Sequence, residues 1–220
     1  MVSACASEVA RSDLPISDDF SGDCEWSEDN DEDISLGCEG GVYRAVFKRT
    51  DERLHHFIPR RIEEPSDFVS VEADAMLHAF PGGSSDDFQA HGVGCWSSEV
   101  GAPTQGYSFL VAPAAHAIAI VKHDETDASL REQFYLRPLL DEESDAVAAV
   151  GETNRIRGKC QATDDGVELT MYLDGKLVGQ VRDPNGFRQF KAFGFVVIST
   201  KTGTDIRFDN FEADEIGEFG

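Results

Sequence analysis

Short runs in which apolar and polar residues alternate recur along this chain, and clusters of Gly, Pro and Asp separate them. Successive side chains of a β-strand point to opposite faces, so this pattern predicts half-buried antiparallel strands. The clearest run is 68–77, where one set of alternate residues is apolar and should face the core: Val69, Val71, Ala73, Ala75 and Leu77. Helical periodicity is scarce, so the pattern predicts an all-β domain.

Twelve strands are expected, at 41–48, 55–58, 68–77, 89–97, 106–110, 117–123, 131–136, 154–162, 166–173, 176–182, 192–200 and 205–213. Asp174 and Gly175 should form a two-residue hairpin turn, because both tolerate the positive φ of a type I′ turn. Residues 144–150 are either a helical turn or a loop. Twelve strands in 220 residues favour a two-sheet antiparallel sandwich of jelly-roll type over an immunoglobulin domain, which is about half this size.

The charge of the chain limits the classes of molecule that it is expected to bind. There are 42 Asp and Glu residues against 19 Lys and Arg, a formal net charge of -23. Such a surface repels nucleic acid and anionic lipid. Neutral glycans, cations such as Ca²⁺ and basic protein patches stay open as partners, and so does a purely solubilising role for the acidity.

We expect a sandwich domain at 17–213, a flexible tether at 1–16 and a short tail at 214–220. Val2, Ser3, Ala4 and Cys5 match a bacterial lipobox, which predicts lipidation of Cys5 and a possible membrane anchor there. A lipobox needs a basic and then an apolar segment before it, and only Met1 precedes these residues. An accidental match is therefore the alternative.

The other four cysteines allow three disulfide pairings. Cys24 and Cys38 flank the acidic stretch 25–37, which is not expected to order itself by burial, and a bridge there would stabilise it by about 3 kcal/mol. Cys95 would then pair with Cys160. Disulfides indicate an extracytoplasmic protein, secreted or anchored to the cell envelope, and buried free thiols are the alternative.

An ordered series of motifs resembles a known family. The series runs Asp18-Asp19-Phe20-Ser21, Trp26, Gly40 to Arg44, Asp67 to Ala75, Gly92 to Trp96, Gly106 to Phe109, Thr153 to Cys160, Leu169 to Val178 and Phe208 to Glu212. It is similar to the concanavalin A-like lectin/glucanase sandwich of actinobacterial secreted proteins and lipoproteins. The resemblance implies a concanavalin A-like jelly roll, and it also implies the Cys95–Cys160 pair. Trp96 departs from it, because similar sequences usually have Arg there.

Glucanases of this fold carry their carboxylates at alternate positions of one strand, as Glu-x-Asp-x-Glu. A second form of the pattern has one further residue before the last Glu. Here Glu72 and Asp74 supply the first two carboxylates, and Met76 and Leu77 occupy both possible positions of the third. The pair is expected to be solvated on the outer face of a strand. An atypical dyad is the alternative, since a glycoside hydrolase needs two carboxylates flanking the scissile bond.

Six residues are candidates for a ligand-binding surface. The aromatic residues Trp96 and Tyr107 have faces that stack on sugars, although Trp96 could equally belong to the face of the sandwich. The basic residues are His55, His56, Arg60 and Arg61. The guanidinium groups of the two arginines bind carboxylates of acidic sugars. They could instead neutralise nearby Glu63 and Glu64. Adjacent His residues in a strand point to opposite faces, so they cannot share one metal ion.

A calcium site is the expected cofactor site. Ca²⁺ takes hard oxygen ligands, and Asp18, Asp19 and Asp209 would supply them between the first and last strands. Turn capping by these residues is the alternative. The sequence thus predicts a non-catalytic module that binds a carbohydrate or another cell-envelope ligand. The alternatives are a structural or protein-interaction module without a small ligand, and a glycoside hydrolase or lyase.

Overall fold

The computed structural model describes residues 11–12, 14–49, 54–82, 87–99, 102, 104–133 and 136–215. Cys5, most of the expected tether and residues 216–220 lie outside these described residues, so lipidation of Cys5 stays a prediction. Among the described residues, no helix is both long enough and apolar enough to span a membrane.

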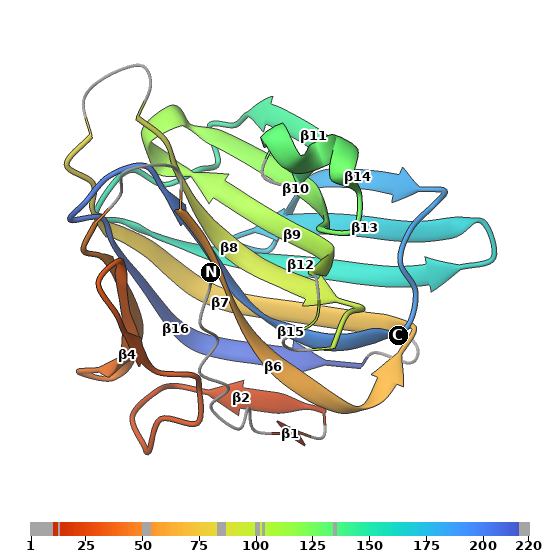
Figure 1. Ribbon diagram of the computed structural model, residues 1–220, viewed down its shortest axis with the longest axis horizontal. Helices are drawn as coiled ribbons and strands as arrows, with labels where there is room; N and C mark the ends of the chain where they lie inside the picture. The colour runs from red at the N-terminus through yellow and green to blue at the C-terminus, as the bar shows by residue number, and fades with distance from the viewer. Residues whose placement is uncertain are drawn as a thin grey trace.

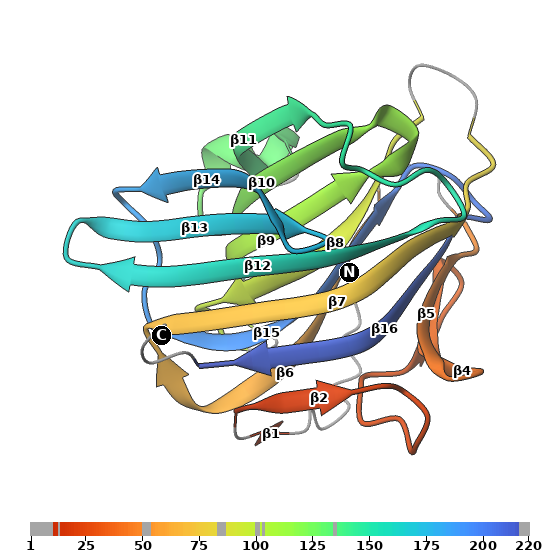
Figure 2. The same ribbon diagram turned by 180° about the vertical axis from the view of Figure 1, so that it is seen from behind.

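The described strands form two sheets, which Figures 1 and 2 show from opposite sides. Sheet A has the order β1 (Arg11–Ser12), β6 (Leu54–Ser66), β15 (Phe190–Ser199), β8 (Gln89–Trp96), β9 (Gln105–Ala112), β10 (Ala117–Asp124) and β11 (Leu136–Glu143). Sheet B has the order β14 (Lys176–Asp183), β13 (Gly166–Leu173), β12 (Thr153–Thr163), β7 (Phe68–Ala79), β16 (Asp205–Asp214), β5 (Val42–Phe47), β4 (Ile34–Glu39) and β3 (Asp29–Asn30), and β2 (Ile16–Asp18) also pairs with β16. Neighbouring strands are antiparallel except β1 and β6, which are parallel.

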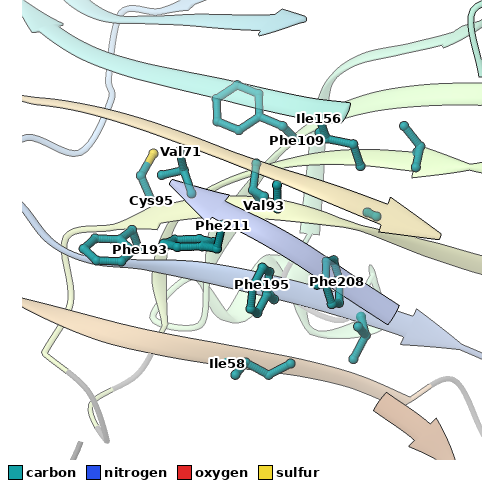
Figure 3. Packing of buried hydrophobic residues seen from close by; sticks show 14 of the residues in the cluster. Ile58, Val71, Val93, Cys95, Phe109, Ile156, Phe193, Phe195, Phe208 and Phe211 are labelled. Carbon is teal, nitrogen blue, oxygen red and sulfur yellow. The ribbon is translucent and has the colours of Figure 1, made fainter. Parts of the chain in front are cut away.

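The core lies between the two sheets and is rich in aromatic rings (Figure 3). Phe195 of sheet A stacks on Phe208 of sheet B with ring centroids 4.2 Å apart. Trp26, from the segment before β3, stacks on Phe195 at 4.5 Å and meets Phe211 edge-on at 4.7 Å. The predicted core-facing set of β7, from Val69 to Leu77, is buried as expected.

Both predicted disulfides are present. Cys24 is bonded to Cys38, and Cys95 of sheet A is bonded to Cys160 of sheet B. The predicted hairpin is also confirmed, because Asp174 and Gly175 have φ angles of 50° and 76° and join β13 to β14. The fold is therefore the expected all-β two-sheet sandwich.

Three local predictions were wrong or incomplete. Of the expected strand at 131–136, residues 131–133 instead belong to a 3₁₀ helix, η2 (Ala128–Gln133), and Leu136 begins β11, among the residues described there. Within the stretch 25–37, Trp26 and Ile34 are buried, at 5% and 0% exposed, which was not expected, whereas residues 28–32 are exposed. Residues 144–150 form a loop, in which the Asn154 side chain accepts from Ala148 N and donates to the carbonyl of Ala146.

Candidate functional site

The outer face of sheet A, which points away from the core, carries three of the predicted binding residues. Strand register places Arg61 of β6, Ala192 of β15 and Trp96 of β8 in one row across the sheet. Trp96 is only 2% exposed, and its indole lies on two glycines of the sheet. A Cβ atom added at Gly94 would come 2.7 Å from the indole, and one at Gly106 would come 2.6 Å from it. Trp96 therefore packs on the sheet and offers no open ring for stacking.

This outer face is strongly concave. The rings of Phe57 on β6 and His123 on β10 lie 4.7 Å apart, although three strands separate β6 from β10. On a flat sheet four strand spacings would separate them by about 19 Å. His55 lies on the same face, with its ring 5.3 Å from that of Phe57. The curvature brings side chains from opposite walls together above Trp96.

A serine and a histidine that were not among the predicted site residues meet in this concave face. His123 Nε2 lies 2.7 Å from Ser108 Oγ, and neither residue is more than 1% exposed. Burial, and then the positive charge of His55, lower the pKa of His123 to about 3. Such a pair activates a serine only where substrate can reach it. Here Phe57 packs against His123, so the pair is a buried hydrogen bond between neutral groups.

The other three predicted binding residues point into the sandwich. Tyr107 is 0% exposed; its hydroxyl donates to Asp183 Oδ2 at 3.0 Å and accepts from Phe187 N at 2.9 Å. His56 packs against the core ring of Phe47 at 6.3 Å, and burial lowers its pKa despite the nearby carboxylates of the 29–33 segment. Tyr107 therefore has no exposed ring face on which a sugar could stack.

Arg60 also lies on the inner side of β6. It binds Glu25 with 2.5 Å between Nη2 and Oε2, and its guanidinium lies over the Trp26 ring. Strand alternation thus places His56 and Arg60 on one side of β6, and His55 and Arg61 on the other. The four basic residues do not form one anion site. The expected separation of the adjacent histidines is confirmed.

The three aspartates of the expected calcium site are engaged in other contacts. Asp18 accepts from the Trp26 indole at 2.9 Å and from Phe20 N at 2.8 Å. Asp19 accepts from the backbone and hydroxyl of Ser21, and Asp209 accepts from Asn210 N. Within the described ranges, no group of three or more His, Cys, Asp or Glu is placed to hold a metal ion. These contacts are those of the turn-capping alternative.

Glu72 and Asp74, the two carboxylates of the glucanase-like pattern, lie on the outer face of sheet B. Both oxygens of Glu72 accept hydrogen bonds from arginines, Oε1 from Arg155 at 2.9 Å and Oε2 from Arg157 at 2.6 Å. Asp74 contacts Arg155 at 3.4 Å and accepts from Asn210 at 2.8 Å. Arg155 also binds Glu212, so it is the centre of an ion-pair network. Both carboxylates are therefore part of this network. The expected solvation is wrong for Glu72, which is only 8% exposed.

A shallow groove lies beside this network, on strands β7, β12, β13 and β14. We call it the polar groove; its volume is about 270 Å³ and its lining is Phe68, Lys159, Gln161, Glu168, Thr170, Tyr172 and Gln180. The ring of Tyr172 is half-buried, and Lys159 Nζ lies 5.0 Å from its centroid. Tyr172 was not among the site residues predicted from the sequence. Its position in the hairpin strand could have identified it, since Leu169, Met171 and Leu173 point inward and Tyr172 must point outward.

Comparison with known proteins bears on the fold. No protein-family model and no curated protein matches this sequence. Among solved structures, an endo-1,3-β-glucanase from Streptomyces sioyaensis matches with a TM-score of 0.60 and 10% identity, over 90% of this chain and 94% of that one. A family 16 endo-glucanase from Bacteroides ovatus matches with a TM-score of 0.57 and 11% identity, over 90% of this chain and 99% of that one.

The carbohydrate recognition domain of Emp47p matches at a TM-score of 0.58 and 12% identity, over 90% of this chain and 94% of that domain. The same domain of Emp46p, in a potassium-bound form, matches with a TM-score of 0.57 and 11% identity, over 83% of this chain and 86% of that domain. Lectin-type and glucanase structures thus share one architecture with this chain. The predicted concanavalin A-like lectin/glucanase jelly roll is confirmed as its fold.

Proposed function

We propose that this chain is a non-catalytic carbohydrate-binding module and that the polar groove of sheet B is its sugar-binding surface. The observation that carries the proposal is the half-buried ring of Tyr172 in a groove whose lining also includes Thr170, Gln161 and Gln180. A sugar ring offers apolar C–H faces and a rim of hydroxyls, so an aromatic ring in a groove lined with hydrogen-bonding side chains suits it. Lys159 above the ring helps to fix the orientation of Tyr172.

Two further observations support this choice. Several solved structures with this fold are carbohydrate recognition domains or glucanases by name. The formal charge of -23 disfavours polyanionic ligands in general, which leaves neutral glycans as the expected class. Identity to these structures is low, so the proposal depends on the lining of the groove.

A non-catalytic role is supported by the contacts of Glu72 and Asp74. A glycosidase needs one carboxyl group free to donate a proton to the leaving oxygen and a second free to act as base or nucleophile. Both Glu72 oxygens accept from arginines, and Asp74 is held by Arg155 and Asn210. We therefore expect binding without hydrolysis.

We further propose an extracytoplasmic location, with the glycan belonging to the cell envelope. The Cys24–Cys38 and Cys95–Cys160 bonds support it, because disulfides persist in oxidising compartments. Lipidation of Cys5 would anchor such a module to a membrane surface.

The test is calorimetric titration of the purified chain against a panel of soluble polysaccharides and oligosaccharides, with Ca²⁺ and with EDTA. The variant Tyr172→Ala should lose binding at least tenfold, and Tyr172→Phe should retain most of it because the ring remains. Val150→Ala is the matched control, since Val150 is 44% exposed and lies in the loop before β12, outside the groove lining. Equal binding by Tyr172→Ala and wild type would refute the assignment of the groove. Release of reducing sugar would refute the non-catalytic role.

A further inference from the structure

The concave outer face of sheet A also contains an apolar cavity that none of the predicted binding residues lines. Its volume is about 700 Å³, within the range of small-molecule sites. We call it the apolar cleft and define it by six residues of its lining: Ala90, Leu110, Ala112, Ala119, Val121 and Ile198. It lies on the opposite side of the sandwich from the polar groove.

The cleft exists because small side chains occupy adjacent positions of neighbouring strands. Ala112 on β9 pairs with Ala117 on β10, and Leu110 pairs with Ala119. Alanine is depleted in strands, and an outer sheet face exposed to water usually carries polar residues. A face packed against another element would carry larger apolar ones. Small and apolar side chains together leave space without offering hydrogen bonds.

Exposure along the cleft shows that it opens to solvent. Residues of its floor are almost fully buried, with Ala90 2%, Leu110 4% and Ile198 1% exposed. Pro138 and Asp141 of β11, at its rim, are exposed. A ligand can therefore enter from the β11 side and reach a floor that water barely touches.

The side chains that line the cleft determine which class of ligand it can bind. Asp141 is the single charged residue among the described lining residues, and every other lining side chain is a hydrocarbon. A sugar or a peptide would lose hydrogen bonds to water there without replacing them, whereas a hydrocarbon chain would lose none. Asp141, the following Glu142 and Glu143, and the net charge of -23 repel an anionic head group at the entrance.

We propose that the apolar cleft binds the aliphatic chain of an amphiphile whose head group is not anionic. The chain lies over the alanines of β9 and β10, and the head group remains at the β11 rim in water. The site is independent of the polar groove, so a failure of either proposal leaves the other standing.

The test uses n-alkanols from heptanol to decanol, titrated by calorimetry into the full chain. Each added methylene should lower Kd about fourfold until the chain fills the cleft. Decanoate should bind at least tenfold more weakly than decanol, because its carboxylate meets Asp141. Ala119→Phe should abolish alkanol binding by filling the cavity, and Val150→Phe, which adds the same ring at an exposed loop position, should not.

Circular dichroism shows whether Ala119→Phe is folded, and Ala117→Leu is the second filling variant. The proposal would be overturned if Kd did not depend on the length of the alkanol or if both filling variants still bound alkanols. It would also be overturned if the wild type bound none of them. A concentration-dependent dimer in ultracentrifugation that both filling variants dissociate would overturn it as well, since the occupant would then be a second copy of the chain. Tyr172→Ala should leave alkanol binding unchanged, which separates this result from that of the glycan experiment.

Discussion

The ammonium of Lys122 and the carboxylate of Asp183 form a buried ion pair, with 2.7 Å between Nζ and Oδ2 and side-chain exposures of 9% and 8%. The pair connects β10 of sheet A to the last residue of β14 in sheet B. The Tyr107 hydroxyl donates to the same carboxylate oxygen, and Lys122 also donates to the carbonyl of Asn185. One carboxylate thus holds two polar groups of sheet A against the end of sheet B.

Asp183→Asn should therefore destabilise the fold strongly. It leaves the Lys122 charge buried without its counter-charge, and loss of one partner of such a pair costs about 3 to 5 kcal/mol. Urea unfolding at pH 7 measures the loss. The double variant Lys122→Met with Asp183→Asn should recover part of it, because no uncompensated charge remains. A single-variant loss below about 1 kcal/mol would show that water reaches the pair.

Acid should destabilise the protein through two buried histidines. Burial lowers the pKa of His91 to about 3, and burial together with the charge of His55 does the same for His123. In the unfolded chain each titrates near 6.5, so between pH 6.5 and 3 the unfolded state binds more protons than the folded state. Stability is fully present above pH 6.5 and falls as the pH is lowered. Each histidine should account for about 2 kcal/mol lost between pH 7 and pH 5.

The measurement compares urea unfolding at pH 7 and pH 5 for the wild type and for His123→Gln. The variant should lose about 2 kcal/mol less than the wild type over this interval, whatever its stability at pH 7. Carboxylates contribute to both proteins and cancel in the comparison. An identical pH dependence would mean that His123 is protonated in the folded state.

Replacement of Trp96 should affect stability and leave glycan binding intact. The indole is 2% exposed, lies on Gly94 and Gly106 and meets Phe57 edge-on at 5.8 Å. Trp96→Ala should cost about 3 to 5 kcal/mol in guanidinium unfolding, the range for a large aromatic side chain removed from a packed site. A variant of unchanged stability that lost glycan binding would instead restore Trp96 as a sugar-stacking residue.

Features that depend on nearby residues were predictable from sequence. Alternation in 68–77 gave the inward face of β7, and Asp174-Gly175 gave a hairpin because the turn chemistry is local. The burial of Trp96 was not predictable, because it depends on the curvature that brings Phe57 of β6 to His123 of β10. The prediction that His55, His56, Arg60 and Arg61 share one binding surface was wrong for a simpler reason. Neighbours along a strand face opposite sides, and the partner of Arg60, Glu25, lies 35 residues away.

The two disulfides should differ in what they contribute to stability. In the chain-entropy model the contribution grows with the loop that a bond closes, and the sequence separations are 14 for Cys24–Cys38 and 65 for Cys95–Cys160. Replacing both cysteines of a pair by Ala should cost about 3 kcal/mol for the first and about 4 kcal/mol for the second. Urea unfolding of the two double variants, without reductant, measures both.

Packing in the folded state should not reverse this order of the two stability losses. The loop closed by Cys24–Cys38 contains Trp26, which stacks on Phe195, and Ile34, which is fully buried, so packing holds the loop without the bond. Cys95 and Cys160 are both 0% exposed in the core and connect the two sheets, so their replacement also removes packing. A larger loss from the Cys24/Cys38 variant would mean that the aromatic contacts of Trp26 depend on the bond.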